Sequence, residues 1–138
     1  MLATLLRALC RLLFRVRLHG KVEAAANGRL LIIANHESFL DGLLLGLYLP
    51  FRPTFVVYTG VLDNWLFRQF LKLVPHLTVD HTSPLGIKKI IRLIEAGEPV
   101  VIFPEGSITN TGSLMKVYEG PAFVAAKTGA SILPVRIH

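Results

Sequence analysis

The 138-residue sequence lacks several features that would assign its class at once. It has one cysteine, Cys10, so no internal disulfide can form. Cys10 lies among leucines, where it fits a small apolar filler. The sequence has no run of about 20 apolar residues, which a membrane-spanning helix needs. It also lacks the unbroken apolar core of a signal peptide, because Arg7, Arg11 and Arg15 interrupt the N-terminal segment every four residues.

Acidic residues are also scarce, with 9 Asp and Glu against 15 Lys and Arg, which leaves a net charge of +6. A basic, leucine-rich N-terminus favours an anionic lipid surface. Nucleic acid is the rival partner for positive charge, but the arginines are interleaved with Leu and Phe, and no nucleic-acid motif follows. We therefore expect a membrane lipid partner and no nucleic acid. Five basic residues precede the first acidic residue, Glu23: Arg7, Arg11, Arg15, Arg17 and Lys21.

The N-terminal segment, residues 1–19, is predicted to form a basic amphipathic helix. On a helix Arg7, Arg11 and Arg15 fall along one stripe, and leucines cover most of the remaining surface. This pattern predicts a helix lying in the membrane interface, with the three arginines binding lipid headgroups. We expect this membrane to be the inner cell membrane, on its cytoplasmic face. The alternative is a helix packed on the domain core.

The chain is rich in apolar residues for its length. Hydrophobic residues make up 52% and the mean hydropathy is +0.54, both high for a freely soluble domain. The length suggests one domain. The last eight residues, 131–138, have the pattern of a buried strand, and domains seldom end inside one. We therefore expect the chain to be a fragment of a longer protein.

Short apolar runs alternate with helical patterns from residue 30 onwards. This order predicts an α/β domain over residues 20–138, with a mainly parallel central sheet flanked by helices. Asp63 is the predicted cap of a helix that runs to about residue 73, and Ser83-Pro84 is a typical helix start. Strands are expected at 30–34, 53–58, 76–80, 99–103 and 131–137, and further helices at 39–49, 83–97 and 120–129.

A polar cluster that contains Asn35, His36 and Asp41 directly follows the first predicted strand. If His36 lies in a loop and Asp41 in the first helical turn, the two side chains can meet. The carboxylate would then fix the imidazole tautomer, and the free ring nitrogen could take a proton from an alcohol. Ser38 could instead be the nucleophile of a hydrolase, but it lacks the Gly-x-Ser-x-Gly setting. A purely structural alternative makes Asn35 and Ser38 helix caps and His36 a surface residue.

A second polar cluster, Phe103-Pro104-Glu105-Gly106, follows the strand expected at 99–103. Gly106 permits close backbone approach, and N–H groups in such a turn can hold phosphate oxygens. Glu105 suits a glycerol hydroxyl or an ordering contact, unless the turn is an ordinary one with Glu105 in solvent. Elsewhere His76 and His81 flank Asp80, but no further ligands lie nearby, so we expect no metal site.

Together the two clusters resemble the lysophospholipid and glycerol-phosphate acyltransferase family, over roughly residues 20–138. The family signatures Asn-His-x4-Asp and Phe-Pro-Glu-Gly are both present, a later glycine pair is matched by Gly112 and Gly120, and 132–136 resembles the final signature. The resemblance implies that His36 is the general base and Asp41 its orienting partner, with no cofactor, metal or acyl-enzyme. The acyl group would pass from coenzyme A or acyl carrier protein to a lysophospholipid acceptor. The expected substrate-binding residues are Asn35, Ser38, Asp80, His81, Glu105, Gly106, Ser107, Thr109 and Lys116.

Three basic positions of the family pattern are lost or weakened here. His81 stands where the second signature has arginine, Ile108 replaces the arginine after the third, and Tyr118 replaces a lysine. Basic residues suit a phosphate monoester, whereas a phosphodiester carries only one charge. We therefore expect lysophosphatidylethanolamine as acceptor, although Lys116 could compensate. Lysophosphatidic acid or glycerol 3-phosphate is the alternative, and a non-catalytic lipid-binding module is the alternative of another class.

The stretch 103–112 also looks like that of bacterial bifunctional 2-acylglycerophosphoethanolamine acyltransferases. In those proteins an acyl-carrier-protein synthetase part follows the acyltransferase part. This resemblance implies acyl carrier protein as donor and an acyl-activating domain beyond residue 138. The residues themselves do not distinguish this donor from coenzyme A.

Overall fold

The structure is a computed structural model that describes residues 1–22, 28–80 and 83–138. Strands and helices alternate along the chain after the N-terminal helix, as the sequence predicts. In chain order the elements are α1 (Leu2–Phe14), β1 (Leu30–Ala34), α2 (Leu40–Tyr48), β2 (Thr54–Tyr58), the 3-10 helix η2 (Thr59–Asp63), α3 (Trp65–Leu71), β3 (His76–Val79), α4 (Pro84–Glu95), β4 (Val100–Ile102), α5 (Gly120–Thr128) and β5 (Ser131–Val135).

The five strands form one sheet in the order β3-β2-β4-β1-β5. Each neighbouring pair is parallel, because a helix crosses back between successive strands. β1 lies between β4 and β5, although these two strands come from the last third of the chain. The predicted α/β class with a parallel central sheet flanked by helices is confirmed.

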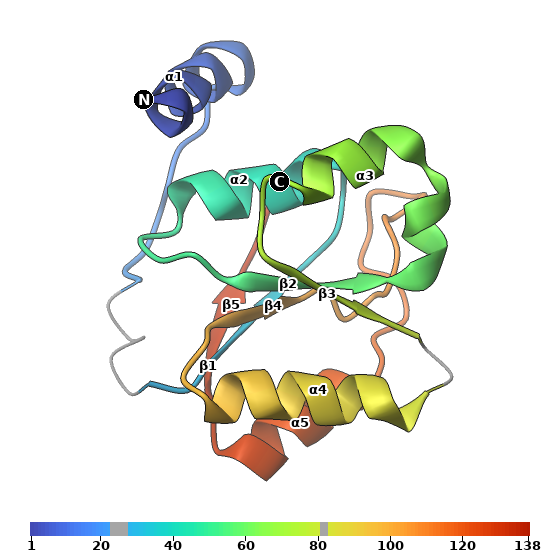
Figure 1. Cartoon of the computed structure of the whole chain (residues 1–138). Helices are drawn as coiled ribbons and strands as arrows, with labels where there is room; N and C mark the ends of the chain where they lie inside the picture. The colour runs from blue at the N-terminus through green and yellow to red at the C-terminus, as the bar shows by residue number, and fades with distance from the viewer. Residues whose placement is uncertain (23–27, 81–82) are drawn as a thin grey trace.

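Helices cover both faces of the sheet, as Figure 1 shows: α2 and α3 lie on one face, and α4 and α5 on the other. Successive residues of a strand point to opposite faces, so β1 supplies both cores. Ile32 packs in the core on the α2 and α3 side, and Leu31 in the core on the α4 and α5 side. Both side chains are fully buried, which explains why β1 is apolar at every position.

Of two predicted helix starts, one is confirmed and the other is corrected. Helix α4 begins at Pro84 as predicted, and the Ser83 side chain accepts a hydrogen bond from the backbone N–H of Leu85. At α3 the predicted cap, Asp63, is wrong, because Asn64 accepts from the backbone N–H groups of the next turn. Asp63 instead ends η2, a 3-10 turn that the sequence pattern did not indicate. An asparagine oxygen caps a helix as well as an aspartate does, so a one-residue shift costs little.

The N-terminal helix α1 lies against α2, and two of its arginines contact that helix. The Arg7 side chain donates to the carbonyl of Leu47, and the Tyr48 hydroxyl donates to the carbonyl of Arg7. The Arg11 guanidinium lies 5.7 Å from the centre of the Tyr48 ring. The last carbonyls of a helix lack internal partners and carry its negative dipole end, so they attract cations. Arg7 and Arg11 therefore contact α2, and Arg15 is the left-handed residue that ends α1.

Most leucines of α1 are exposed, as are its arginines, whereas Cys10 is buried and Leu6 is partly buried. Leu5, Leu9 and Leu12 are 67%, 47% and 79% exposed, and helical spacing places Leu5 and Leu9 on the side opposite Arg7. In the described part of the chain, no helix has the length and apolar content needed to cross a bilayer.

Candidate active site

The two polar clusters meet because β1 and β4 are adjacent and end at the same edge of the sheet. Leu31 pairs with Val100, an offset of 69 residues. The same offset of 69 continues past the strands, where the backbone N–H of His36 donates to the Glu105 carboxylate at 3.0 Å. The sheet register therefore places the first cluster opposite the second.

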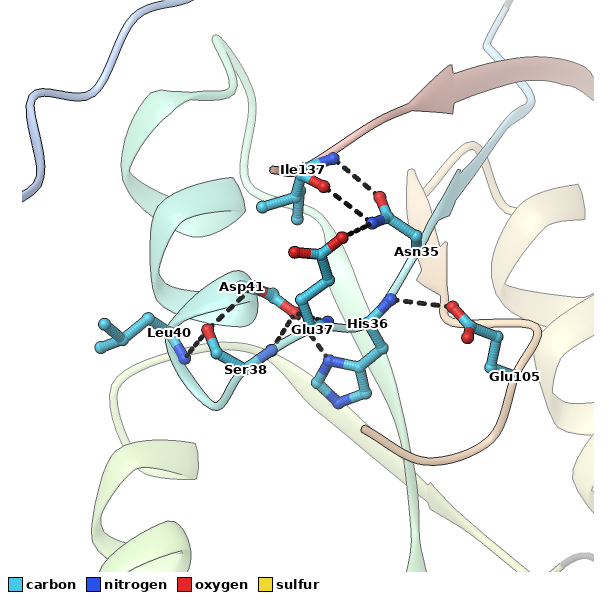
Figure 2. A network of polar contacts seen from close by, with 8 residues as sticks. All are labelled: Asn35, His36, Glu37, Ser38, Leu40, Asp41, Glu105 and Ile137. Atoms are coloured by element: carbon cyan, nitrogen blue, oxygen red, sulfur yellow. Dashed lines mark hydrogen bonds and ion pairs between the residues drawn. The ribbon is translucent and has the colours of Figure 1, made fainter. Parts of the chain in front are cut away.

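His36 and Asp41 are in contact, which confirms the expected meeting of the two side chains. The Nδ1 atom of His36 lies 2.9 Å from the Oδ2 atom of Asp41 (Figure 2). The contact forms because His36 lies in the loop after β1, whereas Asp41 lies in the first turn of α2. In the same view the second ring nitrogen points away from Asp41. Since Nδ1 faces a carboxylate, the tautomer with the proton on Nδ1 is favoured, and Nε2 is left as an acceptor.

Asp41 is 1% exposed and accepts four hydrogen bonds in all. Besides His36, the donors are the backbone N–H groups of Glu37 and Ser38 and the Ser38 hydroxyl. Burial alone would raise the pKa of Asp41. The bonds from His36 and from the two following residues outweigh burial and lower this pKa below its usual value, so Asp41 stays ionised at neutral pH.

The 103–119 loop binds both backbone groups of His36, its N–H and its carbonyl. Glu105 accepts from the His36 N–H, and the Thr109 N–H donates to the His36 carbonyl at 2.8 Å. The second carboxylate oxygen of Glu105 accepts from the backbone N–H of Met115 at 2.9 Å. Glu105 is only 4% exposed. Of the alternatives for Glu105, the structure therefore shows the ordering contact, and the solvated alternative is wrong.

Asn35 and Ser38 are also bound to the chain itself. The Asn35 side chain donates to the carbonyl of Ile137 and accepts from the N–H of the same residue, both at 2.7 Å. The Ser38 hydroxyl donates to Asp41 and accepts from the backbone N–H of Leu40. Both side chains thus shape the His36 loop, where the sequence predicted substrate contacts. The hydroxyl of Ser38 is directed at a carboxylate and has no histidine as base, which disfavours the hydrolase alternative.

An apolar cavity of about 220 Å³ opens beside the imidazole. Gly106 and Ser107 lie at this cavity with His36, as expected for residues that meet a substrate. The Gly106 N–H donates to the carbonyl of Phe103, so it closes the turn. Burial, and then the nearby Tyr118, raise the pKa of Tyr58 in the wall. The remaining lining residues are Phe39, Gly42, Phe55, Val56, Val57, Tyr58, Val61, Phe67, Phe70, Leu71, Phe103 and Ile108.

Other predicted substrate contacts lie away from this cavity. Asp80 follows β3, which β2 and β4 separate from β1. Lys116 is exposed, with its ammonium 5.5 Å from the centre of the Tyr118 ring. His81 lies outside the described residues. Within residues 1–22, 28–80 and 83–138, no group of His, Cys, Asp or Glu has the arrangement to hold a metal ion.

Comparison with known proteins identifies the family of this chain. Residues 15–138 match the family described as Acyltransferase. The chain belongs to the acyltransferase family. It is 27% identical over 135 residues to a 1-acyl-sn-glycerol-3-phosphate acyltransferase of Bacillus subtilis. The matched region covers 96% of this chain and 67% of the relative. It is 32% identical over 111 residues to the chloroplastic 1-acyl-sn-glycerol-3-phosphate acyltransferase LPAT1 of Arabidopsis thaliana, covering 76% of this chain and 30% of the relative.

Other acyltransferases match over most of this chain as well. Lysophosphatidylcholine acyltransferase 2 of Danio rerio is 31% identical over 134 residues, which cover 90% of this chain and 24% of the relative. The crystal structure of the 1-acyl-sn-glycerophosphate acyltransferase PlsC from Thermotoga maritima shares the fold, with a TM-score of 0.66 and 19% identity, over 84% of this chain and 47% of that one. The chain thus spans only about a third of the length of the plant relatives that it matches.

The apolar wall of this acyltransferase site was missed at the sequence level. Phe67 and Phe70 of α3 form part of this wall, whereas Trp65 of the same helix is 68% exposed. The sequence contains one signal that could have indicated this wall, the pair Gly42 and Gly46, which lie four residues apart on α2. A methyl group at either glycine would meet an aromatic ring within 4 Å. Glycines at helical spacing therefore marked the face where α2 leaves room for aromatic side chains.

The lowered pKa of Asp41 predicts how the stability of the fold depends on pH. Because its folded-state pKa lies below the ordinary value of 3.8, ionised Asp41 stabilises the fold above that pH, and this contribution is lost as pH falls through the lowered pKa. The free energy of unfolding of the wild type should exceed that of Asp41→Asn at neutral pH, and the gap should narrow in acid. Urea unfolding followed by circular dichroism at several pH values measures the gap, with Asp63→Asn as a control for removing an exposed carboxylate. A gap that stays constant into strong acid contradicts the prediction.

Proposed function

We propose that the chain catalyses acyl transfer from an acyl thioester to the hydroxyl of a lysophospholipid, with His36 as general base. One observation carries the proposal: His36 Nδ1 bonds the buried Asp41 carboxylate, while the same imidazole lines an apolar cavity. A general base needs an oriented ring and a free nitrogen that faces the substrate. Membership of the acyltransferase family supports the reaction class.

The arrangement accounts for each proton in this reaction. Nε2 of His36 takes the proton of the acceptor hydroxyl as the hydroxyl oxygen attacks the thioester carbonyl carbon. The imidazolium that forms is stabilised by Asp41, which stays ionised because its pKa is lowered. When the tetrahedral intermediate collapses, the carbon–sulfur bond breaks, and the thiolate takes the proton back from the imidazolium. The products are the acylated lipid and a free thiol, and His36 returns to its starting state.

The cavity suits the acyl chain, because its wall is almost entirely apolar and aromatic. Hydrocarbon burial against such a wall is favourable by about 25 cal/mol per Å² of surface removed from water. Ser107 is the exposed polar residue of this cavity, so we assign it to the glycerol part of the acceptor. The thioester then lies between hydrocarbon and glycerol, next to the imidazole.

We propose lysophosphatidylethanolamine as the acceptor. The position where the family has an arginine is Ile108, and this side chain lies in the apolar cavity wall. A phosphate monoester with nearly two charges would find no cation there, whereas a phosphodiester carries only one charge. Lysophosphatidic acid is the second candidate, since the Bacillus subtilis and Arabidopsis thaliana relatives are named for that acceptor. Acyl carrier protein is the proposed donor, with an acyl-activating domain further along the parent chain.

We also propose that α1 attaches the protein to the cytoplasmic face of the inner membrane, where thioester carriers are present. Arg7 and Arg11 contact α2, and the exposed leucines of α1 form an apolar surface that is available to lipid. An apolar helix face buries itself at the boundary of headgroups and acyl chains.

The central prediction concerns His36. His36→Ala should lower the turnover number by about 10²–10⁴, the contribution of general-base catalysis. The matched control is His76→Ala, because His76 is exposed on β3 and lies outside the cavity wall. Turnover is measured with purified protein and a radiolabelled acyl thioester. If His36→Ala keeps full activity, His36 is not the general base. If the wild type binds lysolipid without any turnover, the chain is a lipid-binding module.

Acceptor and donor are tested together. Lysophosphatidylethanolamine should give a higher kcat/KM than lysophosphatidic acid, and acyl carrier protein a higher value than coenzyme A. Ile108→Arg restores the family cation and should shift preference toward lysophosphatidic acid, because charge-assisted bonds to phosphate are strong. A wild type that clearly prefers lysophosphatidic acid refutes the proposed acceptor and leaves the reaction class intact.

Membrane attachment is tested with vesicles of phosphatidylethanolamine and phosphatidylglycerol. The triple variant Leu5→Ser, Leu9→Ser, Leu12→Ser should release most of the protein from floated vesicles, because it removes the exposed apolar face of α1. Leu85→Ser is the matched control, since Leu85 is 62% exposed on α4, on the other face of the sheet. Equal flotation of the triple variant and the control would show that α1 is not the attachment site.

A further inference from the structure

The ring of Phe103 stacks on the imidazole of His36. The two ring centres are 4.2 Å apart, and the ring planes differ by 20°. The contact follows from the sheet, because Phe103 is the first residue after β4 and His36 the second after β1. The last paired residues of these strands are Ile33 and Ile102. Both rings line the same cavity, so Phe103 covers one face of the imidazole beside the substrate space.

Phe103 supplies a restraint that the hydrogen bonds of His36 do not. The bond from Nδ1 to Asp41 directs one edge of the imidazole, but the ring plane can still turn about that direction. The bonds of Glu105 and Thr109 hold the peptide of His36 and leave the side chain free. A ring lying parallel at van der Waals distance fixes the plane, and with it the direction of Nε2.

We propose that Phe103 is a positioning residue for the base, which holds the imidazole plane and stabilises the imidazolium that forms at the transition state. This inference rests on the proposed role of His36 as general base. The face of an aromatic ring is negative and attracts a cation. The imidazole is charged only after it has taken the proton of the acceptor hydroxyl, so the contact is stronger at the transition state than in the resting enzyme. Interactions of that kind raise kcat and leave KM nearly unchanged.

A cavity-wall role alone would give a different kinetic pattern. In that case any apolar side chain of similar size would serve, and the loss of Phe103 would mainly raise KM for the acyl donor. Phe70 is the matched residue, because it lines the same cavity but lies beside Gly42 of α2. No ring contact joins Phe70 to His36 among the described residues.

The experiment compares Phe103→Leu, Phe103→Tyr and Phe70→Leu in the full chain, with kcat and KM measured for donor and acceptor. Phe103→Leu should lower kcat about tenfold, equivalent to about 1.4 kcal/mol, with KM changed less than about threefold. Phe103→Tyr keeps an aromatic face and should retain kcat within about threefold of the wild type. Phe70→Leu should raise KM for the donor more than it lowers kcat.

A spectroscopic measurement tests the contact without relying on a variant at Phe103. The Cε1 proton of His36, assigned by its loss in His36→Ala, should resonate upfield of the other histidines because of the ring current of Phe103. An unshifted resonance overturns the proposal, and so does an equal fall in kcat for Phe103→Leu and Phe103→Tyr. An active His36→Ala variant instead refutes the proposed base itself. An inactive His36→Ala variant together with a fully active Phe103→Leu refutes only the role of Phe103.

Discussion

The site depends on one buried carboxylate, that of Asp41. It is 1% exposed and accepts bonds from the imidazole, from two backbone N–H groups and from one hydroxyl. A buried charge without such partners would be costly, so the four donors must be present together. Asp41 also lies in the first turn of α2, where the helix dipole favours a negative charge. The Asp41 carboxylate therefore closes the loop after β1 from the first turn of α2 and orients the imidazole.

The segment around His36 is held by side chains where the sheet itself ends. On the β4 side, Glu105 bonds the His36 N–H at the register of the strands. On the β5 side, Asn35 bonds both backbone groups of Ile137, two residues beyond the end of the strand. Side-chain oxygen and nitrogen atoms thus replace backbone partners on both flanks. The described chain accordingly leaves no buried side-chain polar atom without a hydrogen bond.

Much of this arrangement was predictable from the sequence, for physical reasons. Apolar runs of strand length separated by helices indicated the parallel sheet, and strand ends in such sheets gather polar residues. The spacing of His36 and Asp41 predicted their contact once a loop and a helix start were assumed. The sequence could not show that Asn35 and Glu105 bind backbone, because the same side-chain atoms suit a substrate equally well. Nor could it orient the arginines of α1, which depend on where the last carbonyls of α2 lie.

The position of β1 between β4 and β5 has a consequence for biosynthesis. Strand β1 leaves the ribosome long before its two neighbouring strands, because the register joins it to residues 69 and 101 positions further along, as for Leu31 with Val100 and Leu30 with Ser131. Translation proceeds at about 5–20 residues per second, so the nascent β1 waits several seconds with both edges unpaired. An unpaired apolar strand is prone to aggregate during that interval. Chaperone capture of the emerging N-terminal third, or early contact of its leucine-rich helix with lipid, would protect it until the last strand arrives.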